Sequence, residues 1–421
     1  MRHVWVVVGI ASFAQPAWSD DGSALTLEGA IHFALTKNER ATIADLNVVI
    51  AEAGVAKARV AFLPALSANG NDQFRPRDKP VDVAQGSLQL SQPLIVPTAF
   101  PLYSEAKQNL AAQVAQTVDD KRTLTFDVAK AYFAVLLDDE VVKAAERKLD
   151  TAKADLADTD AQSKAQLVST NDVTRARISL AGSERELASD RGQLDTAYVQ
   201  LALLINQRIK PGLAPPTTIL DASQKPLSAT DELVGKSLAR RPDLVAKKHS
   251  ANAAHDFASE PRYRILPSLV LSGQLSATSN SGMSGHDVDG VIELSAQWNI
   301  WDGNRSADEK SRDAQAAIAD LNIDALARSV EAQVRSAAAQ LVSSQQAMQS
   351  ARSAMEASQK SASETAVLYK QGLAKAIELI DANDQRFTAE VAFAEAQFTV
   401  ATAYLALRQA MGLDPIGTEL Q

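Results

Sequence analysis

The spacing of apolar residues divides the first half of the chain into helices and strands. Two stretches with the 3.6-residue spacing of amphipathic helices end at Leu63-Pro64, because proline cannot continue a helix. Apolar and polar residues then alternate one by one, which is the period of a strand with one apolar face. The pattern predicts helices at 27–36 and 41–62, strands at about 65–74 and 86–95, and helices at about 103–161 and 171–205.

The second half of the chain repeats this order of elements. Leu-Pro-x-Leu at 63–66 recurs at 266–269, and Thr-Ala-Tyr at 196–198 recurs at 402–404. Similar segments in one order at a nearly fixed offset indicate two copies of one structural unit. The second copy predicts helices at 231–239 and 243–259, strands at about 268–277 and 291–301, and helices at about 306–369 and 375–411. The repeats therefore cover 20–206 and 231–412, with a Pro-rich linker at 207–230 and a C-terminal tail at 413–421.

The long helix of each repeat carries a heptad of apolar residues. Such spacing indicates a left-handed coiled coil, and about 60 residues of helix span about 90 Å, more than a compact domain measures. Each long helix is predicted to turn back as a hairpin, with tips at 166–170 and 371–374. The heptad positions are Val128, Val135, Val142, Leu149 and Leu156 in the first repeat and Val334, Leu341, Met348, Met355 and Ala362 in the second.

The amino terminus has the pattern of a secretory signal peptide at 1–19. Arg2 precedes an apolar run from Val4 to Ala14, and a small-x-small end follows at 17–19. No other stretch approaches the roughly 18 apolar residues of a membrane helix. If the mature protein enters a membrane, we therefore expect it to do so as a closed β-barrel.

Four predicted strands are too few to close a barrel alone, because small barrels need about 8. Three copies would supply 12 strands and a ring of long helices, so the expected fold is mainly α. It consists of coiled-coil hairpins in an α-barrel and a 12-stranded β-barrel shared by a homotrimer. The same alternation also fits a water-soluble antiparallel sheet with one face on a core, since it is a weak signal in each segment.

Composition removes several kinds of chemistry. The chain has no Cys and 5 His, which excludes thiol catalysis and Cys-ligated metals. The formal charge of −9 without a basic block disfavours nucleic-acid binding. The run His286-Asp287-Val288-Asp289 is interpreted as a solvated loop, because no second cluster supplies further metal ligands. We therefore predict no enzyme activity, no cofactor and no metal site.

The chain resembles the TolC-type outer-membrane factors, the outer membrane efflux protein family. The resemblance covers nearly the whole mature chain and rests on duplicated motifs in one order. It implies a trimeric outer-membrane channel that continues through the periplasm of a Gram-negative bacterium. Such a channel is the exit duct of a tripartite efflux pump or a type I secretion system. The motifs are Leu-Pro-x-Leu at 63–66 and 266–269, Gln-Pro-Leu at 92–94, Trp-Asp-Gly at 301–303, Gly372-Leu373, and Ala-Tyr-x-x-Leu ending each returning helix.

The resemblance also implies where the channel is gated and what it contacts. In the family the hairpin tips constrict the tunnel with acidic rings and Tyr-centred contacts, which match Tyr369, Glu378 and Asp381. Glu378 and Asp381 also fit an ordinary solvated helix face. Ala374 stands where the family has a basic residue, with Lys375 adjacent. A periplasmic adaptor, itself bound to an inner-membrane transporter, is expected at the tips, at Leu167, Ser169, Gly372 and Leu373.

Two aromatic residues near the end of the last predicted strand have two interpretations. Trp298 and Trp301 fit an aromatic girdle against outer-membrane lipid, and they also fit a packed core. The competing function is a periplasmic coiled-coil adaptor or scaffold that does not span the membrane. Within the channel hypothesis, drug, metal and polypeptide export stay equally open.

Overall fold

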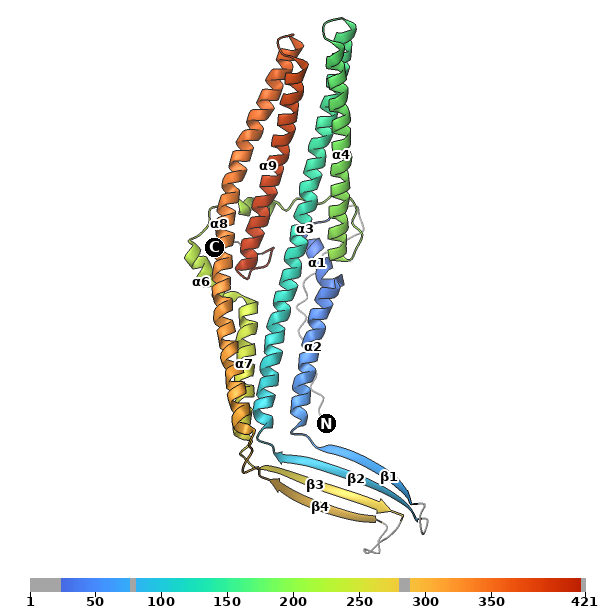
Figure 1. Cartoon of the computed structure of the whole chain (residues 1–421), viewed down its shortest axis with the longest axis vertical. Coiled ribbons are helices and arrows are strands. Elements are labelled where there is room, and N and C mark those ends of the chain that lie inside the picture. Colours follow the sequence, from blue (N-terminus) through green and yellow to red (C-terminus); the bar gives the residue numbers. More distant parts are fainter. Residues whose placement is uncertain (1–23, 76–80, 280–287, 418–421) are drawn as a thin grey trace.

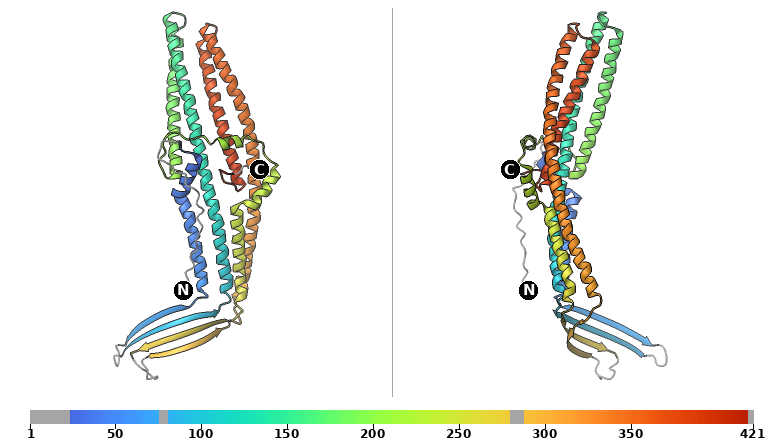
Figure 2. Two further views of the ribbon diagram at one scale, coloured as in Figure 1. Left: turned by 180° about the vertical axis from the view of Figure 1, so that it is seen from behind. Right: turned by 60° about the vertical axis from the view of Figure 1, so that its left-hand side comes forward.

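The protein is an elongated molecule with long helices at one end and a sheet at the other, as seen in the computed structural model (Figure 1). The structure describes residues 24–75, 81–279 and 288–417. The expected signal peptide at 1–19 and the end of the C-terminal tail lie outside these residues, as do His286 and Asp287. The sheet bends away from the long axis of the helices (Figure 2).

Each repeat places two helices, two strands and a long helical hairpin in that order. Helices α3 and α8 each have 66 residues, about 100 Å of continuous helix. The first repeat contains α1 (Leu27–Lys37), α2 (Glu39–Val60), β1 (Ala65–Arg75), β2 (Val81–Ile95), α3 (Ala99–Lys164) and α4 (Thr170–Ile205). After α5 (Thr217–Ser223), the second contains α6 (Thr230–Arg240), α7 (Pro242–Tyr263), β3 (Ser268–Thr278), β4 (Val288–Gln297), α8 (Arg305–Lys370) and α9 (Ala376–Ala410).

Several boundaries differ from the sequence-based expectation, and β2, for example, begins at Val81 rather than near 86. The last strand ends at Gln297 rather than near 301, because its partner β3 begins at Ser268, which pairs with Gln297, so the residues after Gln297 have no partner in β3. The first long helix begins at Ala99 rather than near 103, because Pro101 lies in its first turn, where no intrahelical N–H bond is lost. The Pro-rich linker 207–230 contains the short helix α5.

Heptad residues of both long helices face the packed side of the hairpins, as their spacing predicts. Val128, Val135 and Val142 are buried in α3. Three residues of α8, Val334, Leu341 and Met348, are buried in the same way. Leu149, Leu156 and Met355 are only partly buried, whereas Ala362, the heptad residue nearest the tip, is buried.

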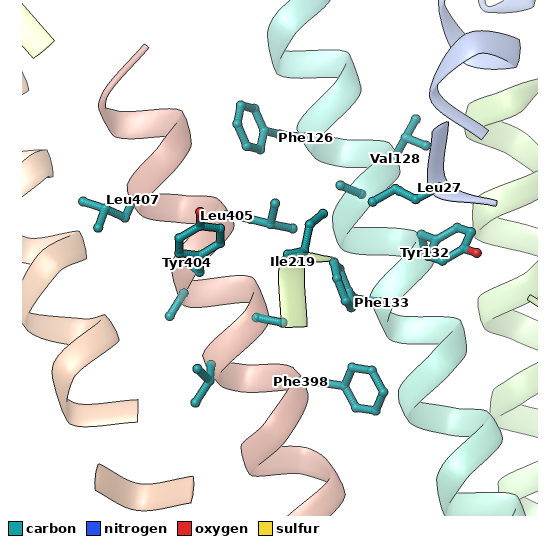
Figure 3. Close-up of a cluster of buried hydrophobic side chains, with 14 of the residues drawn as sticks. Leu27, Phe126, Val128, Tyr132, Phe133, Ile219, Phe398, Tyr404, Leu405 and Leu407 are labelled. Carbon is teal, nitrogen blue, oxygen red and sulfur yellow. The ribbon is translucent and has the colours of Figure 1, made fainter. Parts of the chain in front are cut away.

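The main hydrophobic core lies at mid-height, where α3 and α9 pack side by side. Phe133 of α3 and Phe398 of α9 face each other with ring centroids 6.1 Å apart (Figure 3). On the opposite side of α3, the Tyr132 hydroxyl lies 2.7 Å from the Leu25 carbonyl oxygen and 2.6 Å from that of Ala214. These contacts tie the first described residues and the linker to the middle of α3.

The four strands form one antiparallel sheet in the order β1-β2-β3-β4. Its register separates the side chains into two faces, since paired residues lie on the same face. One face is apolar, with Leu66 opposite Leu90, Leu88 opposite Leu275 and Leu271 opposite Leu294. The other face is polar, with Gln89 opposite Gln274, Ser91 opposite Ser272 and Ser272 opposite Glu293. β1 and β4 are the unpaired edges of this sheet.

Candidate functional site

The two hairpin tips are built by the same turn. Gln166 has φ of 61° and Gly372 has φ of 75°, the left-handed conformation that ends many helices. The following residues donate backward in the same way, Leu167 N–H to Gln162 O and Leu373 N–H to Leu368 O, each at 2.9 Å. Leu167 and Leu373 are 75% and 73% exposed. Each tip therefore presents one leucine to its surroundings.

The helices that return from the tips begin with carboxylate caps. Ser169 and Asp172 cap α4 reciprocally, with Ser169 N–H donating to Asp172 Oδ2 at 3.2 Å. In α9, Lys375 N–H donates to Glu378 Oε2, also at 3.2 Å. Glu378 thus stabilises the start of α9, a role that its predicted position in an acidic ring does not include.

The structure places the three predicted gate residues in two different environments. Tyr369 is 5% exposed and packs with Ala376 and Leu379 near the tip. Glu378 and Asp381 are exposed on α9. The tyrosine therefore contacts the neighbouring helices, while the two carboxylates face outward from their own helix within this protomer.

The buried Tyr369 hydroxyl joins the second hairpin to the first. It lies 3.1 Å from Thr159 Oγ1 on α3. Thr159 donates its own proton to Asp155 O at 2.7 Å, so Tyr369 donates to Thr159. Thr159 was not singled out from the sequence, because one threonine in a polar stretch of a long helix gives no signal of its distant partner.

Further polar contacts continue down the same boundary between α3 and the second hairpin. The Asn383 amide donates to Asp155 Oδ2 at 2.8 Å, Lys148 Nζ lies 3.0 Å from Asp384 Oδ1, and Arg147 pairs with Glu390 at 3.1 Å. We call these three pairs, together with Thr159–Tyr369, the polar seam.

Burial changes the acidity of groups in the polar seam. It raises the pKa of Asp155, and the hydrogen bond from Asn383 opposes that rise. For Glu390, burial acts to raise the pKa, but the bonds from Arg386 and Arg147 outweigh it and leave the pKa below its ordinary value. Glu390 therefore stays ionised and keeps its arginine partners.

The two tryptophans lie between the sheet and the helices, just beyond β4. Trp298 Nε1 donates to Ile265 O at 2.8 Å, which fixes its indole. Trp298 and Trp301 are 60% and 86% exposed in the protomer. They are positioned at the junction where the sheet meets the helical body.

The described residues hold no group of three or more His, Asp or Glu side chains arranged to bind a metal ion. In the same part of the chain, no helix combines the length and the apolar character that crossing a membrane requires.

The chain belongs to the outer membrane efflux protein family, whose model matches residues 31–207 and 233–413. The two matched ranges correspond closely to the two repeats. The cobalt-zinc-cadmium resistance protein CzcC of Cupriavidus metallidurans is 25% identical over 336 residues, covering 73% of this chain and 77% of CzcC. The outer membrane protein TolC of Vibrio cholerae is 23% identical over 371 residues, covering 85% and 84%.

Solved structures of outer-membrane channels share this fold. CusC superposes with a TM-score of 0.81 at 18% identity, covering 92% of each chain. The open state of MtrE from Neisseria gonorrhoeae gives a TM-score of 0.78 at 23% identity, covering 94% of this chain and 90% of MtrE.

These comparisons confirm the resemblance to outer-membrane factors. The protein lies in the outer membrane of a Gram-negative bacterium and extends into the periplasm, as the family does. The family consists of outer-membrane efflux proteins, which disfavours the alternative of an adaptor that never enters the membrane.

Proposed function

We propose that three copies of this chain form an outer-membrane channel that serves as the exit duct of a tripartite efflux pump or a type I secretion system. The channel is a passive conduit, and an inner-membrane transporter, reached through a periplasmic adaptor, selects what enters it.

One observation supports this proposal: the two edge strands of the sheet and the two outermost helices next to it lie on the same two sides of the protomer. The helices nearest the sheet pack in the order α2, α3, α7, α8, and the strands pair in the order β1 to β4 (Figure 1). α2 leads into β1, and β4 leads into α8. One side of the protomer therefore ends in α2 and β1, and the other ends in α8 and β4.

Both helical edges expose apolar side chains. Ile43, Leu46 and Ile50 of α2 are 55%, 55% and 68% exposed, and Ile318 and Leu321 of α8 are 57% and 65% exposed. If the side with α2 and β1 packs against the side with α8 and β4 of a second copy, the two sheets and the two sets of helices are joined in one contact. Such a head-to-tail contact closes into a ring, and three copies supply 12 strands.

The tips supply the gate and the adaptor contact in this proposal. Tyr369 holds the hairpins together, while Glu378 and Asp381 of three copies form acidic rings around the axis. The adaptor binds the exposed turns at Leu167, Ser169, Gly372 and Leu373. Trp298 and Trp301 lie at the boundary of the outer-membrane lipid.

The assembly is tested by the mass of the purified mature protein in detergent, measured by native mass spectrometry. We expect three protomer masses per particle. A monomer that stays in solution without detergent would contradict the proposal.

A further inference from the structure

The ammonium group of Lys148 on α3 contacts two other helices, α4 and α9. Its Nζ lies 2.8 Å from Glu186 Oε2 on α4 and 3.0 Å from Asp384 Oδ1 on α9. It also lies 4.4 Å from the centroid of the Phe387 ring, on α9. The side chain is 17% exposed. Lys148 thus connects both helices of the first hairpin to the returning helix of the second.

Lys148 stays charged in this position. Burial lowers the pKa of its ammonium, but the hydrogen bonds to Glu186 and Asp384 together outweigh burial and leave the pKa above its ordinary value. Two carboxylates from different hairpins therefore share one positive charge. Without it, Glu186 and Asp384 would repel each other across the boundary between the hairpins.

The position of Lys148 along the hairpins determines where the two hairpins can separate. Phe387 of α9 packs against an apolar cluster of the first hairpin formed by Val142, Ala145 and Leu187. Further toward the sheet, Phe133 of α3 packs against Phe398 of α9, and water cannot replace such apolar contacts at low cost. Toward the tips, two further pairs of the polar seam follow, Asp155–Asn383 and Thr159–Tyr369. A groove of about 390 Å³ between α4 and α9 reaches Lys148, so water has access to it. The hairpins can therefore separate above Lys148 while they stay packed below it.

We propose that Lys148 is a positioning residue that holds the two hairpins of one protomer together beneath the gate, by neutralising Glu186 and Asp384. It acts on the conduit through Tyr369 and the tips rather than by touching what passes. The link to conductance rests on the proposed channel function, whereas the separation of the hairpins can be measured without it.

The test is Lys148→Met, which keeps the side-chain length and removes the charge. In planar bilayers we expect the open population of single channels to rise roughly tenfold, the effect of losing a partly buried charge pair. Because the chain has no Cys, spin labels at Leu167→Cys and Leu373→Cys report the distance between the tips in detergent. That distance should lengthen in the variant.

A triple variant separates the charge effect from general damage. Lys148→Met with Glu186→Gln and Asp384→Asn also removes the charges of the two carboxylates that Lys148 bridges, so these two groups no longer repel each other and the wild-type tip distance and open population should return. A purely structural role for Lys148 would leave the triple variant as open as the single one, and that result would overturn the inference.

Lys143→Met is the matched control. Lys143 lies five residues earlier on α3, and its partners Asp139 and Glu140, both at 2.8 Å, are on the same helix. It should change neither readout. Unchanged tip distances in Lys148→Met would refute the positioning role even if the protein conducts. Absence of any conductance in the wild type would refute the channel function and leave the distance test standing.

Discussion

The buried hydroxyl of Tyr369 links the two hairpins near their tips by a hydrogen bond. Tyr369 donates to Thr159, and Thr159 donates to the backbone of its own helix, so both groups are satisfied away from water. The exposed carboxylates of Glu378 and Asp381 make no such link between hairpins within the described residues. At residue scale, the resting position of the tip therefore depends on Tyr369 more than on the acidic pair.

Tyr369→Phe removes this hydrogen bond and keeps the ring. Thr159 keeps its bond to Asp155 O, so the loss is about 1 kcal/mol, or roughly fivefold in the open population. Single-channel recordings should show more frequent opening. Tyr103→Phe, a hydroxyl removed near the other end of α3, is the control, and equal effects of the two variants would refute the assignment.

Asp190 on α4 carries a carboxylate oxygen that is out of contact with water and has no hydrogen-bond partner among the described residues. Burial raises its pKa above the ordinary value of 3.8, and Glu186 adds to the rise. An acid with a raised pKa takes up a proton on folding, so it lowers stability as the pH rises through and above that window.

Asp190→Asn should therefore raise the melting temperature at pH 7 and have a smaller effect at pH 4, where the wild-type carboxyl is already closer to neutral. The gain is roughly 0.5 kcal/mol, because the group is only partly removed from water. Asp195→Asn, an exposed carboxylate on the same helix, is the control. A variant that melts lower than the wild type at pH 7 would contradict the account.

At the scale of elements, the two tips are copies of one turn with different residues. Gln166 and Gly372 occupy the same left-handed position, which glycine adopts without strain and glutamine does not. Gly372→Ala should lower the stability by about 1 kcal/mol, whereas Gln166→Gly should not lower it. Thermal unfolding in detergent measures both, and the opposite order would refute the equivalence of the turns.

The sequence predicts elements well where one periodicity is sustained. Heptads such as Val128, Val135 and Val142 identify buried faces of long helices, because 3.5-residue spacing fits a packed seam. The end of β4 at Gln297 was not predicted, because apolar alternation continues through Trp298 and Ile300 while the backbone already turns toward α8. Alternation indicates which face a residue would take in a strand, whereas the start of the partner strand at Ser268 decides where β4 stops.

Contacts within the polar seam could not be predicted from the sequence. Asp155 and Asn383 are 228 residues apart, and their pairing depends on how two long helices align. Likewise, the sequence identifies Glu378 as an acid near the tip but not as the cap of α9, because that role depends on where the helix begins.

At the scale of the whole molecule, the account depends on two edges that have no partner in one protomer. Ile50→Asp on α2 or Leu321→Asp on α8 would place a charge in the expected contact between copies. Either change should reduce the trimer fraction seen by native mass spectrometry in detergent. Leu167→Asp, an equally exposed leucine at a tip, should leave that fraction unchanged, and a loss of trimer in this control alone would place the contact elsewhere.

The most direct measurement of the central claim is electrical. The purified mature protein, inserted into a planar lipid bilayer from detergent, is predicted to give discrete single-channel steps, and the conducting fraction should contain three chains. A protein that stays trimeric and folded yet passes no ions, in the wild type and in Tyr369→Phe alike, would contradict the claim that the trimer encloses a conduit.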